Sequence, residues 1–406
     1  MQELTAQQER FGDRLLDREA ELSALGEMAA LASSGQGGVT VVEGPAGIGK
    51  SRLLEEVAGV ARDAGLESLT ARGTELEREL PFGVVRQLFE ARLFALEPAE
   101  RDEVLSGAAA VSAPIFLDLP ADAPLLDAEP ASAHHGLYWL TANLAVRAPL
   151  AIVVDDAHWA DPASLRFLVY LANRASDLPV LLVVARRHPE PEVDTDLTDR
   201  IAAVPRARTL RPRALRHDAV AVLVRVVLDA EPDASFAAAC HRSTGGNPLF
   251  LRELLQSLAG DGVVPSAAAA ERVMSVAPES VARLVRRRLR ALGTAAVELA
   301  RAIAVLGDGS DLAAAARLAT IGPDESLAAA DALARFDLLA PGEARFVHPI
   351  VRAAVYSELP GAEAARMHSR AAVLLAERGD DDDRVAVQLL AAEPGDGRWA
   401  VETLRR

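Results

Sequence analysis

Hydrophobic residues follow two patterns along this chain, and the pattern changes near residue 212. Before that point, five short apolar runs alternate with segments whose apolar residues recur at helical spacing. Short β-branched runs predict buried strands, and strands that alternate with helices predict an α/β fold with a doubly wound parallel sheet. The predicted strands cover residues 39–42, 66–70, 150–154, 180–185 and 207–210.

After residue 212 the pattern is almost wholly helical. Within it, three predicted helices precede two short strand-like runs, which together are the outline of a winged helix. These helices and runs cover residues 295–306, 311–319, 324–336, 338–340 and 344–347. The last segments, 362–378 and 385–406, predict paired helices and the start of a helical-repeat region. We expect the native protein to continue beyond Arg406.

The first predicted strand leads into a glycine-rich turn and a helix. Gly44, Gly49, Lys50 and Ser51 fit the pattern G-x-x-x-x-G-K-[ST] in that context. Glycine lets the backbone N–H groups of such a turn point at a phosphate, and the helix N-terminus adds partial positive charge. We expect Lys50 to reach the β- and γ-phosphates and the Ser51 hydroxyl to bind Mg²⁺. The candidate nucleotide-binding residues are Gly44, Pro45, Ala46, Gly47, Ile48, Gly49, Lys50, Ser51 and Arg52.

Lys50 is the only lysine in the chain, and every other residue in the combined count of lysine and arginine is an arginine. A compact ammonium on a flexible stem fits a closed phosphate loop, whereas a planar guanidinium does not. The single lysine therefore favours a phosphate-binding role over an ordinary surface position at the start of a helix.

Paired acids follow the third predicted strand. Asp155 and Asp156 stand where a buried parallel strand delivers carboxylates to the ligand-binding edge of an open sheet. Asp155 is suited to Mg²⁺, so the predicted metal ligands are Ser51 and Asp155. Asp156 is suited to orient or deprotonate an attacking water. The alternative is that both acids only cap the helix that begins near Asp161.

Two arginines, Arg186 and Arg187, follow the fourth predicted strand. An arginine at that tip can stabilise charge at the γ-phosphate of a nucleotide. A solvated pair that simply ends the strand is the alternative.

Composition narrows the class of protein further. The net charge of −16 makes the chain a poor candidate for binding nucleic acid by itself. One cysteine, Cys240, excludes an internal disulfide. No apolar run approaches membrane-spanning length, and the polar N-terminus lacks the apolar core of a signal peptide. We therefore expect a cytoplasmic protein without membrane contact.

Several motifs occur in an order that resembles a known family. The chain is similar to the ATPase part of the large ATP-binding regulators of the LuxR type, and in one segment, HGLYWLTANLA at 135–145, to actinobacterial members. These belong to the signal-transducing ATPases with numerous domains (STAND), as does the maltose-regulon activator. The other motifs are LLDREAEL at 15–22, GPAGIGKS at 44–51, VVDDAHWAD at 153–161, TGGNPLFLREL at 244–254 and FVHPIVRAAVYSEL at 346–359.

The resemblance implies roles for further residues. Arg18 and Glu19 match a motif whose backbone lines the adenine pocket, although Asp17 stands where glycine is usual. It identifies Arg187 with the family's sensor arginine, with Arg186 one position away.

Two more roles concern the helical half. Pro248 matches the lid proline that packs beside the nucleotide, and His348 resembles the winged-helix histidine that meets the β-phosphate of ADP.

The resemblance also implies a domain plan built on an ASCE/AAA-like P-loop NTPase. Its parts are an adenine-side segment and helix at 1–35, the α/β domain at 36–212, a helical lid with the Gly-Asn-Pro motif at 213–276, a winged helix at 277–359 and the beginning of TPR-like repeats at 360–406.

Proteins of this family act as ATP/ADP switches with slow hydrolysis, and the resemblance implies that this chain binds ATP or ADP with Mg²⁺ and self-associates in the ATP state. It also implies control by an unknown inducer and DNA binding only through a C-terminal helix-turn-helix absent from this chain. A STAND ATPase with a non-transcriptional output is the alternative. A phosphotransferase would need a second-substrate site with its own base and basic clamp near the phosphate loop, and the sequence shows none beyond Asp156.

Overall fold

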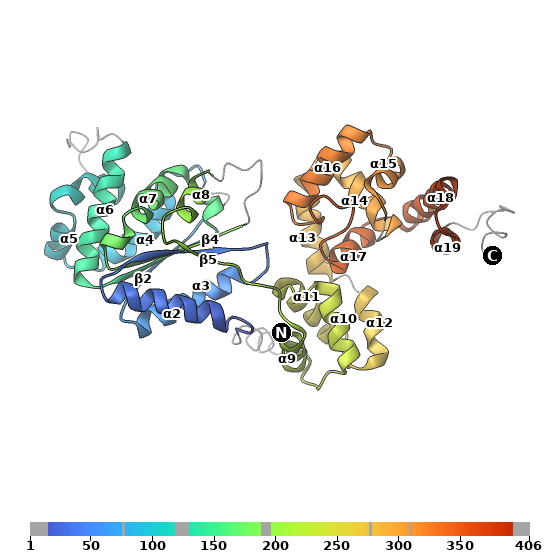
Figure 1. Cartoon of the computed structure of the whole chain (residues 1–406), viewed down its shortest axis with the longest axis horizontal. Helices are drawn as coiled ribbons and strands as arrows, with labels where there is room; N and C mark the ends of the chain where they lie inside the picture. The colour runs from blue at the N-terminus through green and yellow to red at the C-terminus, as the bar shows by residue number, and fades with distance from the viewer. Residues whose placement is uncertain are drawn as a thin grey trace. The chain divides into compact units, whose positions relative to one another are not determined.

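The structure, a computed structural model, consists of two units. Leu15–Arg213 form an α/β unit, and the chain from Ala214 onward forms a helical unit (Figure 1). The described residues are 15–74, 78–117, 130–187, 196–275, 278–307 and 310–392.

The α/β unit is built on a five-stranded sheet in which every neighbouring pair of strands is parallel. The strand order is β2-β3-β4-β1-β5, so β4 lies between the strand before the glycine-rich loop and the strand that carries the paired acids. This confirms the predicted α/β class and doubly wound parallel sheet. The strands are β1 (Gly38–Glu43), β2 (Glu67–Arg72), β3 (Leu150–Asp155), β4 (Val180–Arg186) and β5 (Arg208–Leu210).

Helices cover both faces of this sheet. One face packs against α2 (Glu19–Ser33) and α3 (Lys50–Asp63), and the other packs against α4 (Gly83–Phe94), α6 (Pro130–Arg147) and α7 (Pro162–Ala172) (Figure 1). Alternate residues of a strand point to opposite faces, so a strand buried on both sides needs a continuous apolar run. The shorter elements of this unit are α5 (Pro98–Val104), η2 (Gly107–Ile115), η4 (Ala157–Trp159), η5 (Ala175–Asp177) and α8 (Asp196–Ala202).

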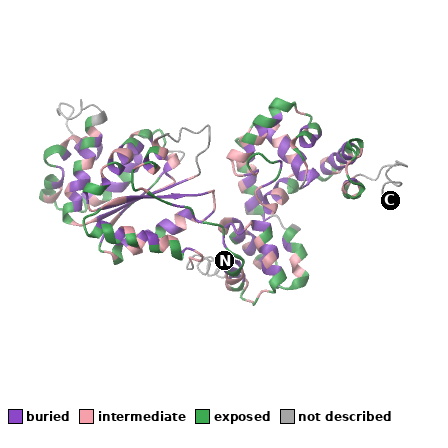
Figure 2. Ribbon diagram, in the orientation of Figure 1, coloured by how far each residue is buried: buried purple, intermediate pink, exposed green. Residues whose placement is uncertain are grey.

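Strand β4 illustrates this double burial. Leu181 belongs to the core shared with α2 and α3, and Leu182 belongs to the core shared with α4, α6 and α7. Both side chains are fully buried, as are all seven residues of the strand by class (Figure 2). The sheet is therefore a rigid platform for the loops at its carboxyl edge.

The helical unit contains no strand within its described residues. Its helices begin with α9 (His217–Leu228), α10 (Ala234–Thr244), α11 (Pro248–Gly260) and α12 (Ala270–Ser275). They continue with α13 (Glu279–Arg290), α14 (Thr294–Leu306), α15 (Leu312–Ala319), α16 (Pro323–Arg335), α17 (Pro349–Ser357), α18 (Gly361–Arg378) and α19 (Asp382–Ala391). None of the helices in the described ranges is both long and apolar enough to cross a bilayer.

The two strand-like runs predicted after α16 form less regular structure than expected. Their only ladder pairing is one isolated antiparallel bridge between Leu339 and Phe346, flanked by a hydrogen bond from the Ala340 N–H to the Arg345 carbonyl at 2.8 Å. Each run is only three or four residues long, and Pro341 has no backbone N–H to give to a ladder. The hairpin shape is therefore present without regular strands.

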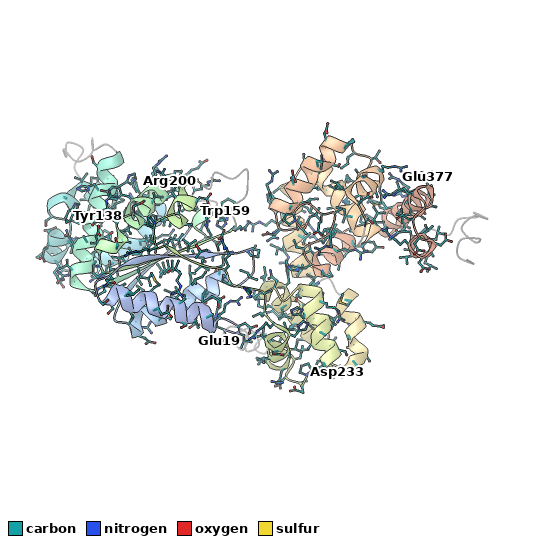
Figure 3. All side chains as sticks on the ribbon, in the orientation of Figure 1. Glu19, Tyr138, Trp159, Arg200, Asp233 and Glu377 are labelled. Atoms are coloured by element: carbon teal, nitrogen blue, oxygen red, sulfur yellow. The ribbon has the colours of Figure 1, made fainter. Side chains whose placement is uncertain are left out.

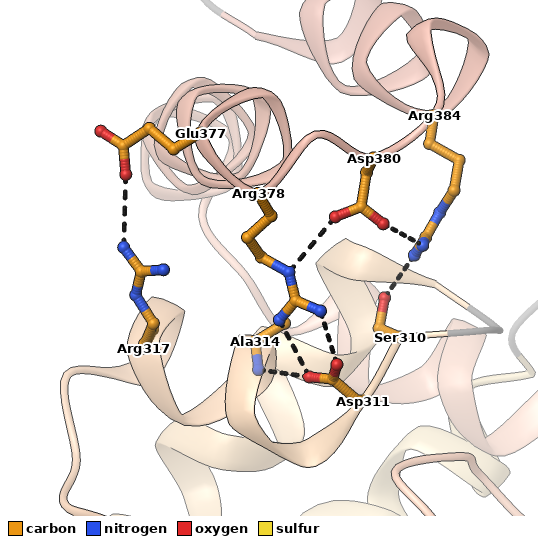
Figure 4. A network of polar contacts seen from close by, with 8 residues as sticks. All are labelled: Ser310, Asp311, Ala314, Arg317, Glu377, Arg378, Asp380 and Arg384. Atoms are coloured by element: carbon orange, nitrogen blue, oxygen red, sulfur yellow. Dashed lines mark hydrogen bonds and ion pairs between the residues drawn. The ribbon is translucent and has the colours of Figure 1, made fainter.

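The last described helices are joined to α15 by charged side chains (Figure 4). Asp311 caps α15 by accepting from the Ala314 N–H, and Arg378 binds the same carboxylate and lowers its pKa. Asp380 lies 3.3 Å from Arg378 and 3.0 Å from Arg384. The predicted final helix begins at Asp382, and residues 393–406 lie outside the described part.

Candidate nucleotide-binding site

The glycine-rich loop connects β1 to α3 at the carboxyl edge of the sheet. Gly47 has φ +80° and Gly49 has φ +97°, a backbone region that side chains with a Cβ rarely adopt. These two glycines let the loop curl so that it enters α3 without a side-chain cap. The first N–H groups of a helix have no partner within the helix, and a helix N-terminus is a common binding site for anions.

Lys50 is the first residue of α3 and is only 7% exposed. Its ammonium donates hydrogen bonds to the carbonyls of Gly44, at 2.8 Å, and Pro45, at 2.9 Å. The side chain thus lies along the inside of the loop, where a phosphate group would also bind. The next predicted residue, Arg52, instead forms ion pairs with Glu55 and Glu56 on the surface of α3.

Ser51 and Asp155 lie together, as predicted for ligands of one cation. The Ser51 hydroxyl forms a hydrogen bond with the Asp155 carboxyl, although 104 positions separate them in sequence. Burial raises the pKa of Asp155, and the Ser51 hydrogen bond and Arg72 act against this rise. A hydroxyl and a carboxylate both offer oxygen ligands to a metal ion. Mg²⁺ in phosphate sites commonly has only one or two protein ligands, with phosphate and water as the others. The donor set therefore fits the ion.

Asp156 adopts a left-handed backbone with φ +47° and points its carboxylate at Arg72. The guanidinium of Arg72 donates from Nη2 at 2.9 Å and from Nε at 3.2 Å, and this pairing raises the pKa of Arg72. The sequence pattern does not indicate this partner. Arg72 ends β2 and lies in register with Asp155, so only the order of the strands reveals it.

The helix after the paired acids has its own cap. Asp161 accepts a hydrogen bond from the Ser164 N–H at 2.8 Å at the start of α7. It also accepts from the Phe82 N–H at 2.8 Å. Asp155 and Asp156 therefore do not serve as the cap of α7, which was the alternative explanation for them.

The two arginines after β4 have different surroundings. Arg186 is 5% exposed and forms ion pairs with Glu43, at 3.5 Å, and with Asp199. Arg187 lies close enough to His158, in the turn after the paired acids, to lower the pKa of that histidine. Arg186 thus has carboxylate partners, and the identification of Arg187 as the sensor arginine stays a prediction.

Arg18 is buried and joins three parts of the α/β unit. Its guanidinium donates to the carbonyls of Ile48 and Arg213, each at 2.8 Å, and of Asp17, at 2.7 Å. Asp17 has φ +56°, which explains why glycine suits this position, and aspartate is among the few other residues that tolerate it. Arg18 thus supports the glycine-rich loop from behind.

Pro248 and His348 belong to the helical unit. Pro248 is the first residue of α11, after an Asn247 cap. His348 precedes α17, with its ring 5.3 Å from that of Phe250 in an edge-on arrangement. Burial lowers the pKa of His348 to about 4, so its ring is neutral at pH 7. Contact of either residue with a nucleotide stays a prediction.

A comparison with curated proteins finds a relative in Rhizobium meliloti (strain 1021), an uncharacterized protein. It is 27% identical over 387 residues, which cover 89% of this chain. The chain spans 37% of the length of that relative.

Solved structures match this fold at low sequence identity. The Walker-type ATPase of Pyrococcus abyssi is 16% identical with a TM-score of 0.54, over 84% of this chain and 96% of that one. The ORC2 protein of Aeropyrum pernix, solved in ADPNP and ADP complexes, is 14% identical with a TM-score of 0.50, over 90% of this chain and 96% of that one. The family model described as AAA ATPase domain matches residues 14–184, which contain the loop, the paired acids, strands β1 to β3 and most of β4. Residues 14–184 are therefore similar to an AAA ATPase domain, and the α/β unit has the parallel-sheet fold of P-loop nucleoside triphosphatases.

Proposed function

We propose that this chain binds ATP and ADP with Mg²⁺ at the loop of residues 44–51 and works as a nucleotide-dependent switch. The observation that carries this proposal is the hydrogen bond between Ser51 and Asp155, beside the buried ammonium of Lys50. It brings the two predicted cation ligands together next to a loop shaped for phosphate. The AAA ATPase match and the ADPNP and ADP complexes of the Aeropyrum pernix protein support the same ligand class.

Each residue of the site has a distinct role in this proposal. Lys50 binds phosphate oxygens, and the first N–H groups of α3 bind the same anion. Ser51 and Asp155 hold the magnesium ion, which when bound neutralises part of the phosphate charge. Arg187 stabilises charge at the γ-phosphate, and Asp156 orients the attacking water.

We further propose that hydrolysis is slow. The carboxylate of Asp156 is engaged by two N–H groups of Arg72, so it is not free to approach a water without breaking or bending that pair. A switch needs a bound state that persists, whereas a bulk hydrolase needs rapid turnover.

The output of the switch is proposed from the ordered motifs. We infer an ATPase module of a LuxR-type regulator, with a lid at 213–276, a winged helix at 277–359 and self-association in the ATP state. The Rhizobium meliloti relative is much longer than this chain, which supports additional regions in such proteins. A helix-turn-helix encoded after Arg406 would support transcriptional output, whereas a cyclase domain there would favour the non-transcriptional alternative.

The binding proposal is tested by Lys50→Ala, with Arg62→Ala on the exposed end of the same helix as the matched control. Nucleotide at about 100 times its Kd should raise the free energy of unfolding of wild type and control by about 2.7 kcal/mol. The Lys50→Ala variant should gain almost nothing from ATP or ADP. An equal gain in Lys50→Ala would show that this loop is not the binding site.

The switch proposal is tested by sedimentation of the wild-type chain with ADP and with the non-hydrolysable analogue ADPNP. If a larger species forms with ADPNP but not with ADP, the nucleotide controls self-association as proposed. The same species with both nucleotides would refute that part of the proposal.

A further inference from the structure

His158 lies in a short, tightly held turn directly after the paired acids. This turn, η4, is closed by hydrogen bonds from the Trp159 N–H to the Asp156 carbonyl, at 2.8 Å, and from the Ala160 N–H to the Ala157 carbonyl, at 3.0 Å. Gly73 packs against it so closely that a Cβ there would lie 2.5 Å from the Asp156 carbonyl oxygen. The position of His158 is therefore fixed by backbone structure.

Both ring nitrogens of His158 are buried, and neither has a hydrogen-bond partner among the residues that the structure describes. Buried polar atoms nearly always have a partner, and one without a partner costs stability. When such an atom occurs in a native protein, a bound ligand, ion or water often supplies the hydrogen-bond partner that the protein lacks. A bound ligand, ion or water would complete the imidazole of His158.

The charges that act on this ring indicate the sign of that partner. Arg187, Lys50 and Arg78 all act on His158 as positive charges, and they come from three separate segments of the unit. Asp156 acts on it in the opposite sense, and its carboxylate is already paired with Arg72. Arg187 is the strongest of these charges, and cations from three segments act on the ring, so its surroundings favour an anion as the partner.

Burial, and next the charge of Arg187, lower the pKa of His158 to about 4. The ring is therefore neutral at pH 7, with one nitrogen that donates and one that accepts. A neutral donor adds a directional hydrogen bond to an anion that Lys50 and Arg187 already attract by charge.

We infer that His158 donates a ring N–H to the γ-phosphate of bound ATP and thereby lets the site distinguish ATP from ADP. This inference rests on the proposed nucleotide site. The γ-phosphate is the anion that ATP has and ADP lacks, and Lys50 and Arg187 are the residues expected to bind it. His158 thus becomes a specificity-determining residue for the state of the switch.

A purely structural role makes a different prediction. The ring of His158 lies 5.3 Å from that of Trp159, which is labelled in Figure 3, so the imidazole also fills space. If packing were its only role, a phenyl ring would replace it without any effect on nucleotide preference.

The test compares His158→Phe, which keeps a ring without N–H, with His158→Gln, which restores an amide N–H. Affinities of Mg·ADPNP and Mg·ADP are measured by calorimetry, and the stability of the nucleotide-free protein is measured by thermal unfolding. His134→Phe is the control, because His134 is another buried histidine with an unpartnered nitrogen but has Arg166 as its charged neighbour.

We expect His158→Phe to bind ADPNP about tenfold or more weakly, with ADP affinity unchanged, because a hydrogen bond to a charged group is lost. His158→Gln should recover part of that loss. The nucleotide-free His158→Phe protein should be as stable as wild type or more so, since an unpartnered polar group is removed. His134→Phe should keep the wild-type ratio of the two affinities.

Equal losses for ADPNP and ADP, or an unchanged ratio in His158→Phe, would overturn the inference while the nucleotide site itself stands. Should His158→Phe not fold, His158→Leu answers the same question. A wild-type chain that binds neither nucleotide would refute the proposed function and this inference together.

Discussion

His348 makes the stability of the helical unit depend on pH in a way that can be calculated. Its ring is buried beside Phe250, and a Cβ added to Gly245 would lie 2.4 Å from its Nδ1 atom. Burial lowers the pKa of His348 from 6.5 to about 4, and the charge of Asp337 only partly opposes this. Between these two values the unfolded chain binds a proton that the folded unit does not. Stability is therefore complete above pH 6.5 and is lost as the pH falls towards 4.

The size of the effect follows from the two pKa values. One pKa unit corresponds to about 1.36 kcal/mol, so the loss approaches about 3 kcal/mol below pH 4. From pH 7 to pH 5, the same linkage relation gives a loss of about 2 kcal/mol.

Amide hydrogen exchange in peptides from α17, corrected for the intrinsic rate at each pH, measures this loss. The perturbation is His348→Gln, since glutamine has no charge to gain in this range. Any constant cost of the substitution cancels when the change from pH 7 to pH 5 is compared between the two proteins. The opening free energy of wild type should fall by about 2 kcal/mol more than that of the variant.

The matched control is His368→Gln, in the same unit, where the histidine ring bonds to Tyr356 and Gln388. The opening free energy of His368→Gln should fall between pH 7 and pH 5 by as much as that of wild type. If His348→Gln loses as much as wild type over that range, burial of this imidazole is not the source of acid sensitivity and the reasoning fails.

Three further predictions use other parts of the chain. Arg186→Met should lower the free energy of unfolding of the α/β unit by about 1.5–3 kcal/mol, because the buried Glu43 loses one of its arginine partners and keeps Arg211; denaturant unfolding followed by tryptophan fluorescence measures this, and an unchanged midpoint would contradict it. Gly245→Ala should cost about 1–3 kcal/mol, because φ is +59° and His348 occupies the space, whereas Gly260→Ala, with nothing within 4 Å, should not; exchange in the helical unit compares the two. Asp156→Asn should slow ATP hydrolysis and retain Mg·ATP binding; phosphate release at the wild-type rate would exclude a role in activating water.

The elements of the sheet were predictable because each depends on a short stretch of sequence. The run before Asp155 is apolar at every position, and the run before Gly44 is β-branched from Val39 to Val42, as a strand buried on both faces favours. The glycine-rich loop was predictable for the same reason, since its residues are contiguous.

The partners of the site residues were not predictable in this way. Arg72 meets Asp156, and Arg186 meets Glu43, only because the strand order places β2 beside β3 and β4 beside β1. The pattern of apolar and polar residues within one strand does not show which strands are neighbours in the sheet. The segment after α16 was predicted to contain two strands, but the structure has only one isolated bridge there. Its runs of β-prone residues are too short to form regular strands.

The hydrogen bonds of Arg18 determine where a fragment of this protein can end without disturbing the glycine-rich loop. The AAA ATPase match stops at residue 184, but one nitrogen of Arg18 bonds to the carbonyls of both Ile48 and Arg213. A fragment cut at 184 would lose β5 and one of these two acceptors of a cation that is 98% hidden from solvent. The weakened bond network would lie directly behind the glycine-rich loop, so nucleotide affinities measured on that fragment would understate those of the intact unit. The compact α/β unit, which runs from residue 15 to residue 213, keeps every acceptor of Arg18.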